Sequence, residues 1–470
     1  MASIVLVNPP LSLEERYGDL SEAGNTLPSI GICTLAAVLR QAGHKVRIIE
    51  AASWGYDHGD ALREIVEVSP DYVGITTLTL SVFSAAKLAE MIEEADKRIR
   101  VIIGGAHVTA VPRETMAMFP QFDAGVLGEG EDTVVELVGA YENGADLKGV
   151  KGIVYREGGE VVVTGMRPFI RDLDRVPFPA FDLLPDFPRG YRPPAFRFKR
   201  LPAASIVTSR GCPYKCIFCD RSVFGSVCRG HSVDYVMEMI KDLVNRYGIR
   251  EFLIEDDTFV TFKSRLIALC ERILRENLKI SWSSLGRVNS VDRDMLKLMK
   301  RAGCWQISYG IESGNQKVLD FVNKKTTLEV VERAVRWTRE AGILSKGFFI
   351  LGHPTDTRET IEETIRFARK LDLHDVSVNM LTPLPGSQIY EVANQYGEFD
   401  NDWRKMNLLN VVFVPYGLTR EELEGYYGRF LKEFYLRPRI ITSYLKRIAS
   451  NPRYSGRYLR GLGAFVRTAF

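Results

Sequence analysis

The chain has 470 residues, of which 46% are hydrophobic and 26% are charged, and its net charge is only +3. This composition is ordinary for a globular protein of roughly two to four domains. The small net charge excludes a global electrostatic field as a basis for binding nucleic acid or acidic partners. No apolar run approaches the roughly 18 residues that cross a bilayer. A first apolar run at Ile4–Val7 leaves no room for a signal peptide, so we expect a cytoplasmic protein.

Residues 1–142 alternate short apolar runs with amphipathic stretches. The expected strands are Ile4–Val7, Val46–Ile49, Tyr72–Thr76, Val101–Gly104 and Ala124–Leu127. Helical patterns lie between them, for example at Ile32–Gln41, Val82–Lys97 and Glu131–Tyr141. Continuously apolar strands separated by helices predict an α/β fold with a doubly wound, Rossmann-like parallel sheet.

Residues 143–200 are rich in proline, glycine, arginine and aspartate, which predicts a linker with one hairpin around Gly158–Gly159. The alternation of strands and helices then restarts over residues 201–430. The expected strands are Ala204–Ser209, Glu251–Glu255, Ile280–Leu285, Gln306–Tyr309, Gly347–Leu351 and Asp375–Met380. Six successive βα units predict a partial, TIM-like (β/α) barrel with its chemistry at the carboxyl ends of the strands.

The C-terminal segment, residues 431–470, carries nine lysines or arginines and a single acid, Glu433, interleaved with apolar side chains. We expect a basic helical tail. Such a tail either lies on an anionic membrane surface or packs on the barrel as a pair of helices with a solvated basic face. The first alternative makes a lipid-like substrate attractive. No base-reading module accompanies the tail, so no nucleic-acid partner is expected.

Three cysteines follow the first expected strand of the barrel. Cys212, Cys216 and Cys219 form the pattern Cys-x-x-x-Cys-x-x-Cys. Thiolates suit iron–sulfur clusters and zinc, and a loop this tight can hold three corners of a cubane whose fourth iron has no protein ligand. A structural zinc site would want a fourth ligand, for which Cys228 and His231 are the nearest candidates. The other three cysteines are scattered in apolar settings and read as small hydrophobes.

This cysteine pattern, with the aromatic Phe218 before the third cysteine, resembles the signature of the radical S-adenosylmethionine (SAM) superfamily. The resemblance implies a 4Fe-4S cluster whose open iron binds SAM. One electron from the cluster then cleaves SAM to methionine and a 5′-deoxyadenosyl radical. The resemblance also implies an anaerobic enzyme with an external electron donor of the flavodoxin or ferredoxin type, and it places Phe218 near the adenine.

Two downstream motifs extend the resemblance. Gly310-Ile311-Glu312-Ser313-Gly314 is similar to the family's strand-four motif, which implies that Glu312 and Ser313 bind SAM; a simple turn is the alternative. Glu255 and Asp256 begin the motif Glu255-Asp256-Asp257, at the place where relatives bind the methionyl amino group. A solvated acidic turn that caps the next helix is an equal alternative.

Two single residues complete the expected barrel site. Arg287 follows the third strand and is expected to bind a carboxylate bidentately, although a surface arginine is the default. His353, in Gly352-His353-Pro354, is a candidate catalytic acid or base, with a hydrogen-bonded structural histidine as the alternative. This motif and Thr382-Pro383-Leu384-Pro385-Gly386-Ser387 match the subfamily that carries an N-terminal cobalamin-binding domain.

The N-terminal segment is also similar to that cobalamin-binding domain. The matching residues follow the expected strands, where open α/β sheets bind ligands. They are Asn8, Thr77, Gly104, Gly105, His107, Gly128, Glu129 and Gly130. The Asp-x-His-x-x-Gly motif that supplies a lower axial histidine elsewhere is missing, and a sheet kept only for structure is the alternative.

These features predict a cobalamin-dependent radical SAM enzyme. The radical would abstract hydrogen from an unactivated carbon, and methylcobalamin would then donate a methyl group. The rival within this class is a radical reaction without methyl transfer, such as oxidative cyclisation or carbon–carbon coupling. A zinc-stabilised binding protein is the hypothesis from another class. We expect a small-molecule or lipid-like substrate and, if the tail meets a bilayer, peripheral contact at the inner membrane surface.

Overall fold

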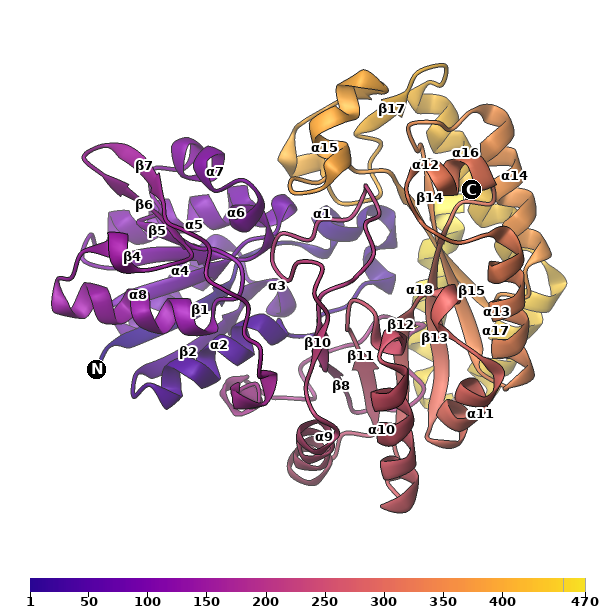
Figure 1. Ribbon diagram of the computed structural model, residues 1–470, viewed down its shortest axis with the longest axis horizontal. Coiled ribbons are helices and arrows are strands. Elements are labelled where there is room, and N and C mark those ends of the chain that lie inside the picture. Colours follow the sequence, from indigo (N-terminus) through magenta and orange to yellow (C-terminus); the bar gives the residue numbers. More distant parts are fainter. Residues whose placement is uncertain (451, 470) are drawn as a thin grey trace.

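The computed structural model describes residues 1–450 and 452–469. Figure 1 shows two sheets side by side, the N-terminal one in indigo to magenta and the second in pink to orange. The first sheet has the strand order β2-β1-β3-β4-β5-β6-β7. Five of its strands are parallel: β1 (Ser3–Asn8), β2 (Lys45–Glu50), β3 (Tyr72–Thr76), β4 (Arg100–Gly104) and β5 (Ala124–Val126). The expected doubly wound parallel sheet is confirmed.

Helices cover both faces of this sheet because alternate strand residues point to opposite sides. Ile4 and Leu6 of β1 belong to a core with α2 (Ile30–Gln41) and α8 (Glu131–Asn143). Val5 and Val7 belong to a second core with α4 (His58–Val68) and α5 (Val82–Ala95). Shorter helices complete this half: α1 (Leu13–Tyr17), α3 (Ala51–Trp54), α6 (Ala106–Ala110) and α7 (Pro112–Met118).

The hairpin expected at Gly158–Gly159 is present, with both glycines at positive φ of 59° and 88°, as a tight two-residue turn requires. It joins β6 (Ile153–Glu157) to β7 (Glu160–Val163). Contrary to the expectation from the sequence, this hairpin is not part of a free linker. Its strand β6 pairs with β5 and adds an antiparallel edge to the N-terminal sheet. The segment expected as a linker, 143–200, therefore begins inside the first sheet.

The second sheet is a partial barrel of parallel strands in the order β15-β14-β13-β12-β11-β8. Its strands are β8 (Ala203–Ile206), β11 (Glu251–Ile254), β12 (Ser281–Gly286), β13 (Cys304–Glu312), β14 (Leu344–Leu351) and β15 (Asp375–Met380). The helices around it include α9 (Val233–Tyr247), α10 (Lys263–Arg275), α11 (Arg293–Arg301), α12 (Gln316–Phe321), α13 (Leu328–Glu340) and α14 (Arg358–Lys370). The expected barrel is confirmed.

Two small antiparallel pairs and one helix lie beyond the regular units. The pair β9 (Ser209–Arg210) and β10 (Arg229–Gly230) follows β8. After β15 come α15 (Gln388–Val392) and the pair β16 (Gly397–Phe399) and β17 (Phe413–Pro415). In Figure 1 this orange segment lies above the gap between the sheets, and the ring of Trp403 contacts that of His107 in the N-terminal domain.

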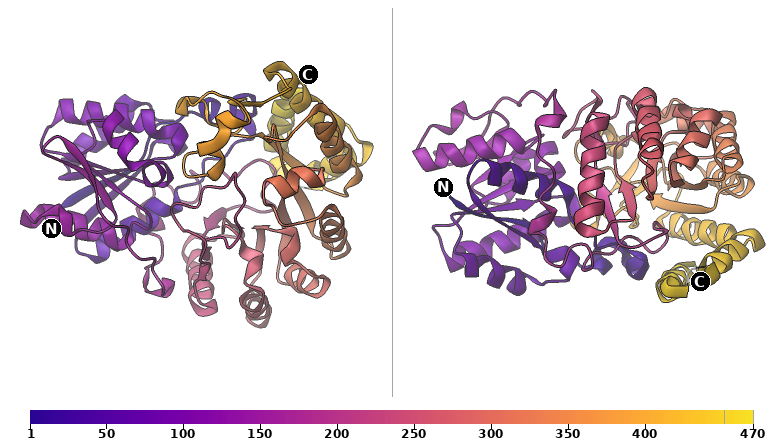
Figure 2. Two further views of the ribbon diagram at one scale, coloured as in Figure 1. Left: turned by 45° about the horizontal axis from the view of Figure 1, so that its top comes forward. Right: turned by 90° about the horizontal axis from the view of Figure 1, so that it is seen from below.

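The chain ends in three helices, α16 (Arg420–Tyr435), α17 (Pro438–Ser450) and α18 (Ser455–Ala469), which lie on the barrel side of the molecule (Figure 2). The ring of Tyr458 stacks on those of Phe196 and Phe198, at centroid distances of 5.9 and 5.6 Å. Arg447 donates hydrogen bonds to the carbonyl oxygens of the same two phenylalanines. This packing corresponds to the second alternative for the tail. Within the described residues, no helix has both the length and the apolar character to span a bilayer.

Candidate active site between the two sheets

The three cysteines lie on a hairpin that projects from the first barrel strand. Its base is the β9–β10 pair, and residues 211–228 form the loop between these strands. We call residues 209–230 the cysteine hairpin. Gly211 opens the loop at φ +86°, where an added Cβ would stand 2.5 Å from the carbonyl oxygen of Val227. Only glycine therefore fits this turn.

Cys212, Cys216 and Cys219 all line one cavity of about 420 Å³, which we call the cluster cavity. It lies at the carboxyl ends of the barrel strands. Arg287 Nη1 donates a hydrogen bond to Cys216 Sγ at 3.4 Å. A hydrogen bond shared with Cys219, together with the charges of Lys324 and Arg287, lowers the pKa of Cys216 to about 6. The same hydrogen bond raises the pKa of Cys219, and burial raises that of Cys212. The two cationic side chains therefore favour the thiolate form of Cys216, the form that binds metal.

Neither candidate for a fourth protein ligand joins these cysteines. Cys228 Sγ donates to the carbonyl oxygen of Gly211 at 3.3 Å. The ring of His231 stacks on that of Tyr235, with centroids 4.0 Å apart. Among the residues that the structure describes, no three histidine, cysteine or acidic side chains surround a point suited to one metal ion. Three thiolates that open on one cavity fit a cubane cluster with an open iron better than a closed zinc site.

Glu312 and Lys324 form a buried ion pair in the wall of the cluster cavity. Lys324 Nζ donates to Glu312 Oε1 at 2.5 Å. Glu312 has φ +70°. Residues other than glycine rarely adopt this backbone conformation, and those that do are often found at functional sites. A Cβ at Gly310 would stand 2.3 Å from Glu312 Oε1 and 2.8 Å from Lys324 Nζ, so the pair lies directly over this glycine. Sequence reasoning missed Lys324, because no motif marks it.

Arg287 lies beside this pair, at the end of β12. Its Nη2 donates to the carbonyl oxygen of Lys324. Its Nε is buried and has no hydrogen-bond partner among the described residues. A buried arginine donor without a partner is costly, so this atom is suited to bind a carboxylate or another acceptor within the cavity.

The three residues of the acidic motif after β11, Glu255-Asp256-Asp257, lie in three different environments. Asp256 is fully buried and accepts hydrogen bonds from Thr208 Oγ1 and Ser209 Oγ, both at 2.6 Å. Burial raises the pKa of Asp256. This carboxylate therefore holds the base of the cysteine hairpin and does not face the cavity.

The two neighbours of Asp256 do reach cavities. Asp257 lines the cluster cavity and accepts from the backbone N–H of Gly211 at 2.9 Å. Glu255 faces the second cavity described below, and its carboxylate lies 3.1 Å from Arg197 Nη2. Of this motif, the residue beside the cysteines is thus Asp257, which the predicted site residues did not include.

Three further expected residues occupy the surroundings of the same cavity. Phe218 lines it, and the ring of His353 lies 6.0 Å from the ring of Phe218. Burial lowers the pKa of His353 to about 3, so its imidazole is neutral at physiological pH. Ser313 is buried, and its Oγ lies 3.1 Å from Thr364 Oγ1, which links the end of β13 to α14. Neither His353 nor Ser313 is among the residues that line the cavity.

A second cavity, of about 260 Å³, lies at the carboxyl ends of the N-terminal strands. We call it the sheet cavity. The strand order places its switch point between β1 and β3, where sheets of this type bind ligands. Gly104, Gly105, Gly128, Glu129 and Gly130 all line it, as expected for a binding edge. The side chains that the N-terminal domain contributes are apolar, threonine or glutamate, without a histidine among the described residues.

The other expected residues of this domain are engaged with protein. Asn8 Nδ2 donates to Glu50 Oε2 at 2.9 Å, and Thr77 Oγ1 donates to the carbonyl oxygen of Gly104 at 3.0 Å. His107 is buried against Trp403, with ring centroids 4.4 Å apart, and burial lowers its pKa to about 4. These three residues do not line the sheet cavity.

The two cavities share a wall. Val223 and Phe224, both on the cysteine hairpin, and Asp257 line the cluster cavity on one side and the sheet cavity on the other. Two ligands bound in these cavities would therefore lie next to each other. An open, glycine-lined sheet edge that faces a cysteine-bearing barrel fits a flat cofactor placed beside a cluster and its cosubstrate.

Comparison with known proteins agrees with this arrangement. Residues 206–368 match the family model of the radical SAM superfamily, and residues 18–138 match that of the B12 binding domain. The chain is 37% identical over 442 residues to an uncharacterized methyltransferase of Pyrococcus horikoshii, with 93% of each chain covered. It is 31% identical over 444 residues to an anaerobic magnesium-protoporphyrin IX monomethyl ester cyclase of Cereibacter sphaeroides, covering 92% of this chain and 70% of the relative.

The fold is similar to that of the cobalamin-dependent SAM radical enzyme OxsB, solved with aqua-cobalamin and SAM. The TM-score is 0.76 at 20% identity, and the match covers 98% of this chain and 72% of OxsB. The chain therefore belongs to the radical SAM superfamily, in the branch with a cobalamin-binding domain, and its cofactors are a 4Fe-4S cluster, SAM and cobalamin.

Proposed function

We propose that this enzyme methylates an unactivated carbon of a small polar molecule. The observation that carries the proposal is the shared wall between the cluster cavity and the sheet cavity. When bound, the cluster and SAM supply the radical that removes a hydrogen atom, and cobalamin supplies the methyl group. Overall, one SAM leaves as methionine and 5′-deoxyadenosine, another leaves as S-adenosylhomocysteine, and an external donor supplies the electrons.

The residues of the barrel have distinct proposed roles. Cys212, Cys216 and Cys219 hold the cluster. Arg287 binds the carboxylate of SAM through its unpartnered Nε, and the Glu312–Lys324 pair holds the ribose or amino acid moiety above Gly310. Phe218, which lines the cluster cavity, packs against the adenine. These residues orient the cosubstrate and exclude water, which is what the protein contributes to such a reaction.

The inner wall of the barrel supports a polar substrate over a lipid. Ser308 of β13 lines the cluster cavity. The residue two positions before it on the strand lies on the same, inner face of the sheet. That residue is Gln306, and Ser283 is its register partner on β12. Gln306 Oε1 and Ser283 Oγ are buried without hydrogen-bond partners among the described residues. Neither residue lines the cluster cavity, since both lie deeper on this face than Ser308. A substrate that extends past Ser308 would have to carry hydrogen-bonding groups to satisfy them.

The electron donor is proposed to be an external protein of the flavodoxin or ferredoxin type. Cys33, Cys270 and Cys304 are buried in separate elements. The described residues therefore offer no second set of cysteines that could hold a relay cluster. A donor that binds near the cluster cavity would have to supply the electrons directly.

Contact of the tail with an anionic membrane surface is a separate proposal. Ile441 and Leu445 are 43% and 59% exposed and lie one turn apart on α17, next to the exposed Lys446. This outer stripe suits shallow peripheral contact. Sedimentation with anionic vesicles, but not with neutral ones, is expected for the native protein and not for Leu445→Glu. Equal sedimentation of both proteins, or of neither, would contradict the membrane contact.

The function is tested with anaerobically purified protein, reconstituted with iron and sulfide and incubated with dithionite, SAM and hydroxocobalamin. We expect a brown protein that forms 5′-deoxyadenosine and S-adenosylhomocysteine. The triple variant Cys212→Ala, Cys216→Ala, Cys219→Ala should form neither, whereas Cys228→Ala should resemble the native protein. 5′-Deoxyadenosine without S-adenosylhomocysteine would favour radical cyclisation or coupling. A colourless, folded, zinc-containing protein would favour a binding function.

The substrate class is tested with SAM labelled in its methyl group and an anaerobic extract of the source organism. We expect the label in a new aqueous product that is distinct from SAM and from methionine, both of which also carry the labelled methyl group. Label confined to the organic, lipid fraction would contradict a polar substrate.

A further inference from the structure

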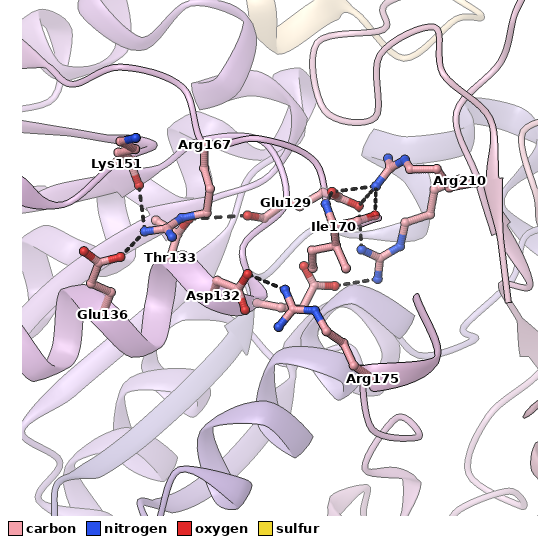
Figure 3. A network of polar contacts seen from close by, with 11 residues as sticks. Glu129, Asp132, Thr133, Glu136, Lys151, Arg167, Ile170, Arg175 and Arg210 are labelled. Atoms are coloured by element: carbon pink, nitrogen blue, oxygen red, sulfur yellow. Dashed lines mark hydrogen bonds and ion pairs between the residues drawn. The ribbon is translucent and has the colours of Figure 1, made fainter. Parts of the chain in front are cut away.

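The cysteine hairpin is fastened to the N-terminal domain at its base. Arg210 and Arg229 are register partners in the β9–β10 pair, one at each end of the cysteine-bearing loop. Arg210 Nη1 donates to Glu129 Oε1 at 2.8 Å, and Arg229 Nη1 donates to Oε1 and Oε2 of the same carboxylate at 2.9 and 2.8 Å. One carboxylate thus holds both ends of the loop. Figure 3 shows Glu129 and Arg210 in this contact.

This contact is buried and its charges are balanced. The side chains of Arg210, Arg229 and Glu129 are only 9%, 8% and 4% exposed. Arg210 Nη2 donates to Glu131 at 2.5 Å, so two guanidinium groups are balanced by two carboxylates. The backbone of Ile170 closes the cluster, because its N–H donates to Glu129 Oε2 and its carbonyl accepts from Arg229, both at 2.8 Å. Buried ions are tolerated when paired and hydrogen-bonded in this way.

The ion cluster sits where the two cavities meet. Glu129, in the turn before α8, Glu131, the first residue of α8, and Arg210 of the cysteine hairpin all line the sheet cavity. Phe224, part of the shared wall, lies under Arg210, with the guanidinium carbon 5.5 Å from its ring centroid. A shift of the hairpin would therefore move the three cysteines and the shared wall together.

The contacts also define what Glu129 does not do. Both of its oxygens accept from arginine, and Oε2 accepts in addition from Ile170. The carboxylate is satisfied by protein donors, although sequence reasoning had placed it among the cobalamin-binding residues. Its neighbours Gly128 and Gly130 line the cavity without any side chain that could bind a ligand.

We propose that Glu129 is a positioning residue that sets the distance between the cluster and cobalamin. This inference rests on the proposed function, in which both cofactors serve one reaction. A carboxylate that binds both ends of the cysteine loop fixes the position of that loop relative to the N-terminal domain. An error of about 1 Å in the position of reacting groups costs on the order of 100-fold in rate. Arg210 and Arg229 transmit the position of the N-terminal turn to the cysteines.

The test is the magnetic interaction between the reduced cluster and cob(II)alamin, measured by pulsed electron paramagnetic resonance in the enzyme loaded with both cofactors. The native protein should show one narrow distribution of distances. Glu129→Gln should broaden this distribution of distances. The amide nitrogen of glutamine cannot accept a hydrogen bond from an arginine, and the substitution removes the negative charge that balances Arg210 and Arg229. The ratio of 5′-deoxyadenosine to S-adenosylhomocysteine should rise about tenfold, because SAM cleavage continues while methyl transfer from the displaced cobalamin becomes slower.

The matched control is Glu136→Gln, on α8, the helix that follows Glu129. Glu136 pairs with Arg167 and is 45% exposed (Figure 3), so this variant should retain the native distribution. Glu129→Asp, which keeps the charge, should recover part of the narrow distribution. If Glu129→Gln does not load both cofactors, Glu131→Gln carries the same comparison, because it removes the negative charge of the second carboxylate that pairs with Arg210.

A native distance distribution in Glu129→Gln, or in Glu131→Gln where that variant is the one measured, would overturn the proposal. The distance measurement requires only that both cofactors bind. A native enzyme that binds them with a narrow distribution but transfers no methyl group would therefore refute the proposed function and leave the role of Glu129 standing.

Discussion

The guanidinium group of Arg287 lies over the ring of Tyr214, with its Cζ 3.6 Å from the ring centroid. Tyr214 belongs to the loop between the first two cluster cysteines, so this stacking joins the end of β12 to the cysteine hairpin. The same arginine donates to Cys216 Sγ, and its buried Nε has no partner in the part of the chain that the structure describes. One side chain thus contacts the cysteine loop and carries the donor that we propose binds the cosubstrate.

Arg287→Lys should weaken SAM binding about tenfold, because an ammonium group replaces neither the planar stacking nor the paired N–H donors. The measurement is the SAM-dependent change in the electron paramagnetic resonance spectrum of the reduced cluster. Arg293→Lys is the control, since Arg293 forms an exposed ion pair with Glu340. Native SAM affinity in Arg287→Lys would argue against this role.

Gly310→Ala should leave the protein folded and reduce SAM cleavage about 100-fold. The added methyl group would overlap Glu312 Oε1 and crowd Lys324 Nζ, which must then move from their places over β13. Gly139→Ala is the control, because a Cβ there meets nothing within 4 Å. Formation of 5′-deoxyadenosine at the native rate in Gly310→Ala would show that the ion pair does not position SAM.

Glu251 should make stability depend on pH. Burial raises its pKa to about 7, and its carboxyl group accepts from Ser281 and from the indole of Trp305. Because the folded protein binds this proton more tightly than the unfolded chain, the free energy of unfolding should fall by about 3 kcal/mol as pH rises from about 4.5 to above 7.

Glu251→Gln should remove this part of the pH dependence. Urea unfolding of the cofactor-free protein at pH 5 and pH 8, compared between the variant and the native chain, measures it. Glu340→Gln, an exposed carboxylate on α13, should behave as native. An unchanged pH dependence in Glu251→Gln would place the titrating group elsewhere.

Tyr458→Ala should destabilise the protein by about 3 kcal/mol, because it removes a ring that is 1% exposed between Phe196 and Phe198. Leu459→Ala, at a neighbouring side chain that is 57% exposed, should change stability by less than about 0.5 kcal/mol. Chemical denaturation compares the two variants. Equal, small effects would mean that the tail contributes little to the stability of the barrel.

The repeating units of both sheets were predictable because local patterns specify them. Apolar runs with turn residues between them located β1 to β5 and all six barrel strands, with ends displaced by a few residues. The cysteine spacing and the Gly310–Gly314 motif were equally readable, since a loop and a strand end carry their residues close together in the chain. The hairpin at Gly158–Gly159 was also readable, but its pairing with β5 was not, because register across a sheet depends on distant strands.

The sequence by itself thus determined the fold class and the two cofactor domains and predicted the cluster ligands, because each depends on residues that are near in sequence. Only the tertiary structure brought Lys324 to Glu312, Asp257 rather than Asp256 to the cavity, and Glu129 to Arg210 and Arg229. These partners are up to 100 residues apart. Their charges attract only when folding removes water and brings them into contact, and no local pattern records that.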